Sequence, residues 1–173
     1  MGGDGNGSYV SSMKGVVTFR YFSEEAIRDL LSKSEVLRFG EGDTIIREGE
    51  KSPYFFAVLE GTVNVTVHDG AKEVFISAIG KGDVFGEAGI FLSVKRTANV
   101  ASAAKTTLVR IHRDSLLRFI KERPSEGVKF LMIIIYSLLK KLRDANQELA
   151  FERKSDIQQD DIDSMVRSIM GEG

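Results

Sequence analysis

Glu87 is a single carboxylate among small residues, an arrangement that could bind an anion attached to a sugar. Gly86 precedes it and Ala88-Gly89 follows it, directly after a strand that we expect to end at Phe85. Small residues let a ligand come close to the backbone, and a short helical turn starting here would present amide groups to an anion. The lone carboxylate can accept hydrogen bonds from a sugar hydroxyl. The pattern therefore indicates a binding site.

Arg96 supplies the positive charge for such a site. It follows Glu87 by nine residues and is itself followed by the hydroxyl side chain of Thr97 and the small Ala98. A guanidinium group is planar and can pair with two oxygens at once, which suits a singly charged phosphodiester. Residues 86–102 contain no second acid, so the pair of carboxylates that acid–base catalysis often uses is missing from this segment.

The composition argues against several other chemistries. The chain of 173 residues carries 24 Lys and Arg against 25 Asp and Glu, without the basic excess that nucleic-acid binders usually show. It has no cysteine and only two histidines, which excludes disulfides and makes a His-rich metal centre or a Ser-His-Asp triad a poor hypothesis. Its most apolar run, residues 130–136, is far shorter than the roughly 20 residues that span a bilayer. We expect a cytoplasmic protein with no metal, no nucleic-acid partner and no membrane span.

Short β-type runs surround the candidate site. They are rich in Val, Ile, Phe and Thr and alternate with glycine-bearing turns, and Asp69-Gly70 between two of them is a strong hairpin signal. This pattern predicts a mainly β fold with flanking helices, an eight-stranded jelly-roll (β-roll) barrel over about 36–112. The expected strands, besides the one ending at Phe85, are 36–39, 44–47, 54–60, 62–68, 73–79, 99–103 and 107–112.

Helical periodicity predicts helices on both sides of the roll. Ser23 precedes two glutamates and can cap a short helix, and Asp114 or Ser115 can cap a second one that ends at Arg123, because a proline follows. We expect a flexible leader over residues 1–18 that contributes nothing to the fold. The domain then covers 19–151, with the C-terminal helices over about 113–151, and the acidic tail 152–173 holds at most a short helix.

The long C-terminal helix, from about 126 to 151, carries an apolar seam. Its members are spaced 4, 3, 4, 3 and 4 residues apart, as in a coiled coil. The seam either lies against the barrel or joins two copies of the chain, and flanking basic residues favour a homodimer through residues 128–150. The seam residues are Leu131, Ile135, Leu138, Leu142, Ala145 and Leu149.

The segment from Phe85 to Ala98 closely resembles the phosphate-binding cassette of the cyclic nucleotide-binding domain family. That cassette reads roughly F-G-E, then apolar and small residues, a short loop, and R-small-A. The resemblance continues in the Phe39-Gly40-x-Gly42-Asp43 and Ile79-Gly80-x-Gly82-Asp83 motifs and in the helices at the end, so that it covers roughly residues 21–150. It implies the same β-roll and a regulatory module without catalytic activity.

The resemblance implies a role for each cassette residue. Glu87 and the amide of Gly86 would hold the ribose 2′-hydroxyl, and Arg96 would pair with the cyclic phosphate. The amide of Gly89 and the amide or hydroxyl of Thr97 would complete the phosphate cradle. Thr97 also resembles family members that accept cGMP, whereas related members with serine prefer cAMP, so the ligand is cAMP or cGMP.

Further positions follow from the same resemblance. Val65 and Ile79 lie on strands where the family packs the sugar and the base, and Asn146 falls where a helix reaches the purine. Ala98 matches the alanine of the family pattern. Ala88 departs from that pattern, because a larger apolar residue usually follows the glutamate; this departure removes no group that contacts the ligand.

The leading hypothesis is a cyclic nucleotide sensor that moves its C-terminal helices and acts through an effector protein. The alternative is a degenerate, non-binding relative that serves as a dimerisation or docking scaffold. A barrel metalloenzyme of the cupin type would need several histidines that the chain lacks. A transcription factor of the same superfamily would need a helix-turn-helix, and the roughly 22 residues after Phe151 are too few and too acidic for one.

Overall fold

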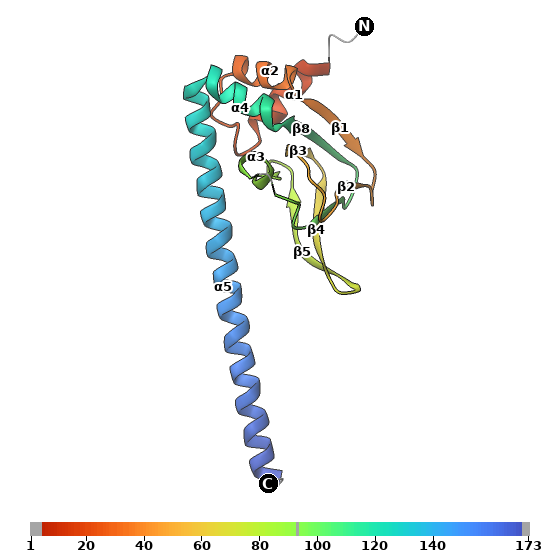
Figure 1. Ribbon diagram of the computed structural model, residues 1–173, viewed down its shortest axis with the longest axis vertical. Coiled ribbons are helices and arrows are strands. Elements are labelled where there is room, and N and C mark those ends of the chain that lie inside the picture. The colour runs from red at the N-terminus through yellow and green to blue at the C-terminus, as the bar shows by residue number, and fades with distance from the viewer. Residues whose placement is uncertain (1–4, 93, 171–173) are drawn as a thin grey trace. The chain divides into compact units, whose positions relative to one another are not determined.

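Eight strands form two antiparallel sheets in the computed structural model, which describes residues 5–92 and 94–170. The strands are β1 (Glu35–Phe39), β2 (Thr44–Ile46), β3 (Tyr54–Glu60), β4 (Thr62–Asp69), β5 (Lys72–Gly80), β6 (Val84–Phe85), β7 (Asn99–Ser102) and β8 (Thr106–His112). One sheet has the order β1-β8-β3-β6 and the other has β2-β7-β4-β5. Figure 1 labels β1, β8 and β3 of the first sheet and β2, β4 and β5 of the second. The predicted mainly β, eight-stranded roll is confirmed, and so is the strand ending at Phe85.

The core of the roll takes apolar side chains from strands of both sheets. Val65 and Ile79, two of the predicted site residues, are partly buried and pack against this core. The rings of Phe56 and Phe85 stack with their centroids 4.9 Å apart, which fixes the end of β6 against β3. The buried members of the core are Ile46, Phe56, Val58, Val63, Phe85, Val100 and Leu108.

The N-terminal segment differs from the flexible leader that the sequence suggested. Residues Gly5–Lys14 form helix α1, and the side chains of Met13 and Val16 are completely buried. The amide of Val17 donates a hydrogen bond to the carbonyl of Gly82, just before β6. The expectation that residues 1–18 contribute nothing to the fold is therefore wrong for this part of the segment. Val10, Met13 and Val16 are spaced three apart among many glycines and serines, and all three are buried.

Helices α2 (Glu24–Ser32) and α4 (Arg113–Glu122) flank the roll. Ser23 caps α2 as predicted, and its hydroxyl accepts a hydrogen bond from the amide of Ala26. Helix α4 ends before Arg123, also as predicted. Its N-cap is His112 rather than Asp114 or Ser115, because Nδ1 of His112 accepts from the amide of Asp114 at 3.1 Å. The last residue of a strand thus caps the helix that follows it.

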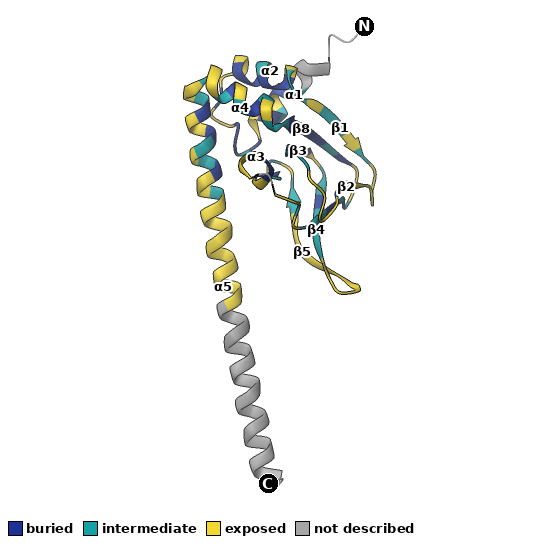
Figure 2. Cartoon of the chain, in the orientation of Figure 1, coloured by how far each residue is buried: buried dark blue, intermediate teal, exposed yellow. Residues whose placement is uncertain are grey.

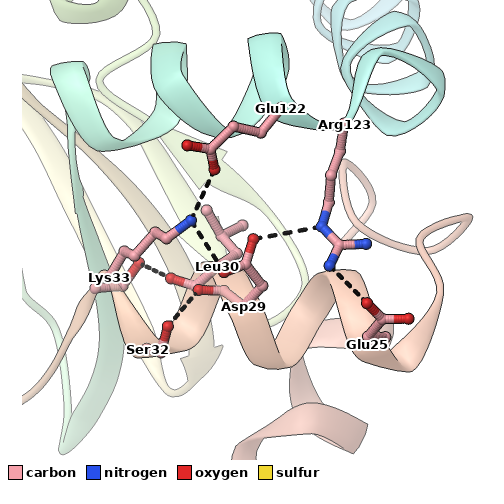
Figure 3. A network of polar contacts seen from close by, with 8 residues as sticks. Glu25, Asp29, Leu30, Ser32, Lys33, Glu122 and Arg123 are labelled. Carbon is pink, nitrogen blue, oxygen red and sulfur yellow. Dashed lines mark hydrogen bonds and ion pairs between the residues drawn. The ribbon is translucent and has the colours of Figure 1, made fainter.

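An ion-pair network joins α2 to the end of α4 (Figure 3). Arg123 pairs with Glu25 at 2.8 Å and with Asp29 at 3.3 Å. Lys33 pairs with Asp29 at 2.9 Å and with Glu122 at 3.0 Å. The hydrogen bond from Lys33 holds the pKa of Asp29 below its ordinary value; burial opposes this effect and Arg123 adds to it. The network therefore links the two helices at the point where the chain enters its last helix.

The last helix, α5, runs from Pro124 to Met170, beyond the predicted end near residue 151. The chain divides into two compact units, the first ending at Ile133 and the second starting at Ile134. In the second unit the seam residues Ile135, Leu138, Leu142 and Leu149 are exposed, as the yellow part of α5 in Figure 2 shows. Within the described residues, none of the helices combines the length and the apolar character that a membrane span requires.

Candidate functional site

The candidate site begins where β6 turns into the short helix α3 (Ala88–Phe91). Gly86 makes this turn with a φ of 83°, a conformation that residues with a side chain rarely adopt. A Cβ atom on Gly86 would lie 2.9 Å from the carbonyl oxygen of Tyr54, and one on Gly89 would lie 2.9 Å from that of Ser52. Any side chain at residue 86 or 89 would therefore collide with the backbone at or just before the start of β3, so both positions require glycine.

The side chain of Arg96 lies against this turn. Its Nη1 donates to the carbonyl oxygen of Gly86 at 3.3 Å, and its Nη2 donates to Oγ of Ser52 at 3.2 Å. Nη2 also donates to the carbonyl oxygen of Tyr54. These three acceptors are uncharged oxygens, so they orient the guanidinium group without neutralising it.

The backbone of Arg96 is held from the other side by the loop between β2 and β3. The amide of Arg96 donates to the carbonyl of Glu50, and the amide of Gly49 donates to the carbonyl of Arg96, both at 2.8 Å. Sequence reasoning identified this loop only as one of the glycine-bearing turns between predicted strands. It missed the contribution of Ser52, because nothing in the local pattern indicates a contact with a residue 44 positions away.

The electrostatics of Arg96 are those of a cation partly withdrawn from water. Burial lowers the pKa of Arg96 from its ordinary value, while the negative charges of Glu50 and Glu87 act in the opposite direction. Its Nε atom is buried and has no hydrogen-bond partner within the described residues. A buried N–H without an acceptor costs free energy. An anion bound beside it would supply the missing acceptor.

Glu87 lies at the start of α3, and its side chain is buried, with 8% of the residue exposed. The amide of Gly89 donates to the carbonyl of Gly86 at 3.0 Å, so in this structure it closes the turn, and its predicted role in holding phosphate stays a prediction. Gly89 is buried and Ala88 is exposed. Thr97 is exposed beside Arg96, and no contact of its side chain with the turn is recorded among the described residues.

The remaining predicted site residues divide into two groups. Val65 on β4 and Ile79 on β5 lie on paired strands, and Val65 is also paired with Val100 on β7, the strand that follows the cassette. Ala98 is half-buried and directly precedes β7. Asn146 is exposed in the second compact unit, so its role toward a purine stays a prediction.

Residues 36–123 match the family model described as the cyclic nucleotide-binding domain. The chain belongs to the cyclic nucleotide-binding domain family. Its cassette is the turn and helix around Glu87 together with Arg96, and the predicted membership is confirmed. Within the described residues of this cyclic nucleotide-binding domain, no three His, Asp or Glu side chains gather into a possible metal site.

Two curated relatives illustrate the range of proteins that contain such a domain. The chain is 32% identical over 116 residues to cGMP-dependent protein kinase, isozyme 2, of Drosophila melanogaster. This alignment covers 65% of this chain and 12% of the kinase. It is 28% identical over 134 residues to the CRP-like cAMP-activated global transcriptional regulator of Mycobacterium tuberculosis, covering 76% of this chain and 58% of the regulator. The match thus spans only part of each relative.

A solved structure supports the fold. A cyclic nucleotide-binding domain from Methylobacillus flagellatus aligns with a TM-score of 0.72 at 24% identity, over 79% of this chain and 80% of that chain. At this level of identity the similarity establishes the β-roll with its helices and carries no statement about the ligand. The ligand has to be argued from the cassette itself.

Proposed function

We propose that this domain binds cAMP or cGMP and acts as a regulatory sensor without catalytic activity. The observation that carries the proposal is the state of Arg96: a guanidinium held by uncharged oxygens, with a buried Nε that finds no acceptor among the described residues. A cyclic phosphate carries a single negative charge on two exocyclic oxygens. It would provide both the counter-charge and the acceptor that this side chain needs.

The other cassette residues complete the proposed binding mode. Glu87 accepts hydrogen bonds from the ribose 2′-hydroxyl together with the amide of Gly86, and Gly89 and Thr97 line the phosphate. The small side chains of the cassette let the ligand come close to the protein backbone. The buried position of Glu87 supports its role, because a carboxylate withdrawn from water gains most from a specific hydrogen-bond donor. Val65, Ile79, Ala88, Ala98 and Asn146 are proposed to contact the sugar, phosphate or base.

The output is proposed to pass through the C-terminal helices to an effector protein in the cytoplasm. The two relatives named above are a cGMP-dependent kinase and a cAMP-activated transcriptional regulator, so in both a cyclic nucleotide controls another activity. The ion-pair network between α2 and α4 ends at Arg123, next to the first residue of α5. A movement of α2 relative to α4 can therefore reach the start of that helix through these ion pairs.

A second candidate function is a dimerisation scaffold that does not need a nucleotide. The exposed apolar residues at coiled-coil spacing on α5 favour it, because such a row is usually covered by another helix. Light scattering coupled to size-exclusion chromatography separates the two functions. A scaffold forms homodimers at the same protein concentration with and without nucleotide, and Leu138→Glu on the seam abolishes the dimer.

Calorimetric titration of the full chain with cAMP, cGMP and 5′-AMP tests the sensor function. We expect saturable one-site binding of at least one cyclic nucleotide and much weaker binding of 5′-AMP, whose phosphate carries a second charge and lacks the ring. The hydroxyl of Thr97 favours cGMP, since it can reach the 2-amino group of a syn guanine. No heat of binding with either cyclic nucleotide, at concentrations up to the millimolar range, would overturn the proposal.

A further inference from the structure

Ser52 contacts both parts of the cassette although it lies outside it. It is half-buried and precedes β3 by one residue, Pro53. Its hydroxyl oxygen accepts a hydrogen bond from Nη2 of Arg96 at 3.2 Å. Its carbonyl oxygen would lie 2.9 Å from a Cβ atom on Gly89. A change at Ser52 is therefore transmitted directly to the arginine that the proposed function assigns to the phosphate.

The geometry of a guanidinium group makes Nη2 the critical nitrogen. A phosphate binds an arginine side chain in a bidentate manner either at the end of the fork, to Nη1 and Nη2, or at its side, to Nε and Nη2. Both edges include Nη2. In this structure Nη2 already donates to two oxygens, the hydroxyl of Ser52 and the carbonyl of Tyr54. Bidentate binding therefore requires one of these two bonds to open.

The two acceptors of Nη2 differ in how easily they can be given up. The carbonyl of Tyr54 belongs to β3, where Tyr54 pairs with His112 of β8, so its position is determined by the sheet. The hydroxyl of Ser52 is a rotor on a single side-chain torsion, and it can turn away without any backbone movement. The bond between Ser52 and Arg96 is therefore the one that opens.

We propose that Ser52 is a positioning residue that holds Arg96 in its resting place and competes with the phosphate for Nη2. This inference rests on the proposed function, and it adds a residue that sets the affinity of the site without belonging to the cassette. Removing the hydroxyl abolishes the competition. The cyclic nucleotide then binds more tightly, by about three- to tenfold, which corresponds to the loss of one ordinary hydrogen bond.

The test is a calorimetric titration of four full-length proteins with the cyclic nucleotide that the wild type prefers. Ser52→Ala removes the acceptor, Ser52→Cys replaces it with a weak one at nearly the same size, and Ser52→Thr retains it. Ala and Cys are expected to raise the affinity, whereas Thr stays close to the wild type. If Ser52→Ala does not fold, as judged by thermal unfolding, the nearly isosteric Cys variant still provides the comparison.

Two further measurements distinguish a positioning role from a merely structural one. Ser34→Ala is the matched control, because Ser34 is also half-buried and its hydroxyl donates to the carbonyl of Leu30, away from the cassette. It should leave the affinity unchanged. In an Arg96→Lys background, which has no fork, Ser52→Ala should have no effect, and this non-additivity shows that Ser52 acts through Arg96.

Each contrary outcome has a distinct meaning. Unchanged affinity in both Ser52→Ala and Ser52→Cys, with a wild type that binds, overturns the role of Ser52 and leaves the sensor function intact. Weaker binding that Ser52→Thr restores makes Ser52 a direct phosphate ligand and overturns the competition. A wild type that binds neither cyclic nucleotide overturns the sensor function, and the inference with it.

Discussion

The guanidinium group of Arg96 lies directly against the Cα atom of Gly89. A methyl group on Gly89 would lie 3.0 Å from Nη1 and 3.1 Å from Nη2 of that side chain. It would also lie 2.9 Å from the carbonyl oxygen of Ser52, which belongs to the backbone and cannot easily move away. The position of the guanidinium group therefore depends on the absence of a side chain at residue 89. The local sequence around either residue does not indicate this contact.

Gly89→Ala should displace the guanidinium group and weaken binding of the cyclic nucleotide by about tenfold or more, the equivalent of one charge-assisted contact. Calorimetry measures the affinity, and thermal unfolding reports whether the fold survives. Gly80→Ala is the matched control, because a Cβ atom on Gly80 meets nothing within 4 Å. Equal affinities of the two variants would show that the contact does not matter for binding.

Arg96→Ala should lower the affinity for the cyclic nucleotide at least tenfold, since it removes the only charge proposed to meet the phosphate. Arg96→Lys keeps the charge and loses the planar fork, so we expect an intermediate affinity. The readout is the rise in melting temperature at saturating nucleotide, because a ligand that binds only the folded state must stabilise it. The control is Arg118→Ala, at an exposed arginine on α4, and it should behave like the wild type. If Arg96→Ala showed the same rise in melting temperature as the wild type, the assignment of Arg96 to the phosphate would be contradicted.

Glu87 should control the recognition of the ribose. The wild type is expected to bind the 2′-deoxy analogue of its nucleotide about tenfold more weakly or worse, because the buried carboxylate then loses its hydroxyl donor. In Glu87→Gln this difference should shrink to a few-fold. Competition binding with both ligands measures it, and Glu60→Gln, at an exposed glutamate of β3, serves as the control. A full 2′-deoxy penalty in Glu87→Gln would assign the hydroxyl to another residue.

Asp29 should contribute stability that depends on pH. Its pKa is lowered in the folded state, mainly by the hydrogen bond from Lys33. Its contribution, about 1 kcal/mol or less, is complete above the ordinary aspartate pKa of about 4 and disappears as the pH falls through the lowered value. Asp29→Asn should therefore lose less stability than the wild type on acidification. Urea unfolding between pH 7 and pH 3 measures this, and parallel curves for both proteins would contradict it.

Met13 should be part of the folded domain rather than of a leader. Its side chain is completely buried, so Met13→Ala should lower the free energy of unfolding by about 2–5 kcal/mol. Ser11→Ala, on the exposed face of the same helix, should change it by less than about 0.5 kcal/mol. Urea denaturation of both variants measures the two changes. A similar small effect in both would mean that the segment contributes nothing to stability.

Local patterns in the sequence were enough for the roll and for the chemistry of the cassette. Strand alternation and the Asp69-Gly70 turn depend on neighbouring residues, and so do the cap at Ser23 and the helix end at Arg123. The prediction of the N-cap of α4 failed because the capping group belongs to a residue type that is not among the usual capping residues. His112 caps α4 with a ring nitrogen, where a search for short polar side chains selects Asp114 or Ser115.

The sequence by itself determined which residues can do chemistry here: Glu87 among small residues, and Arg96 nine positions later. Only the tertiary structure decided how that arginine is held, because two of the partners of its side chain, Ser52 and Tyr54, lie more than 40 positions away. Such contacts arise from the pairing of the sheets and the burial of side chains, which depend on the whole fold. The residue types establish that a phosphate can be bound, and the fold decides which bond must open to receive it.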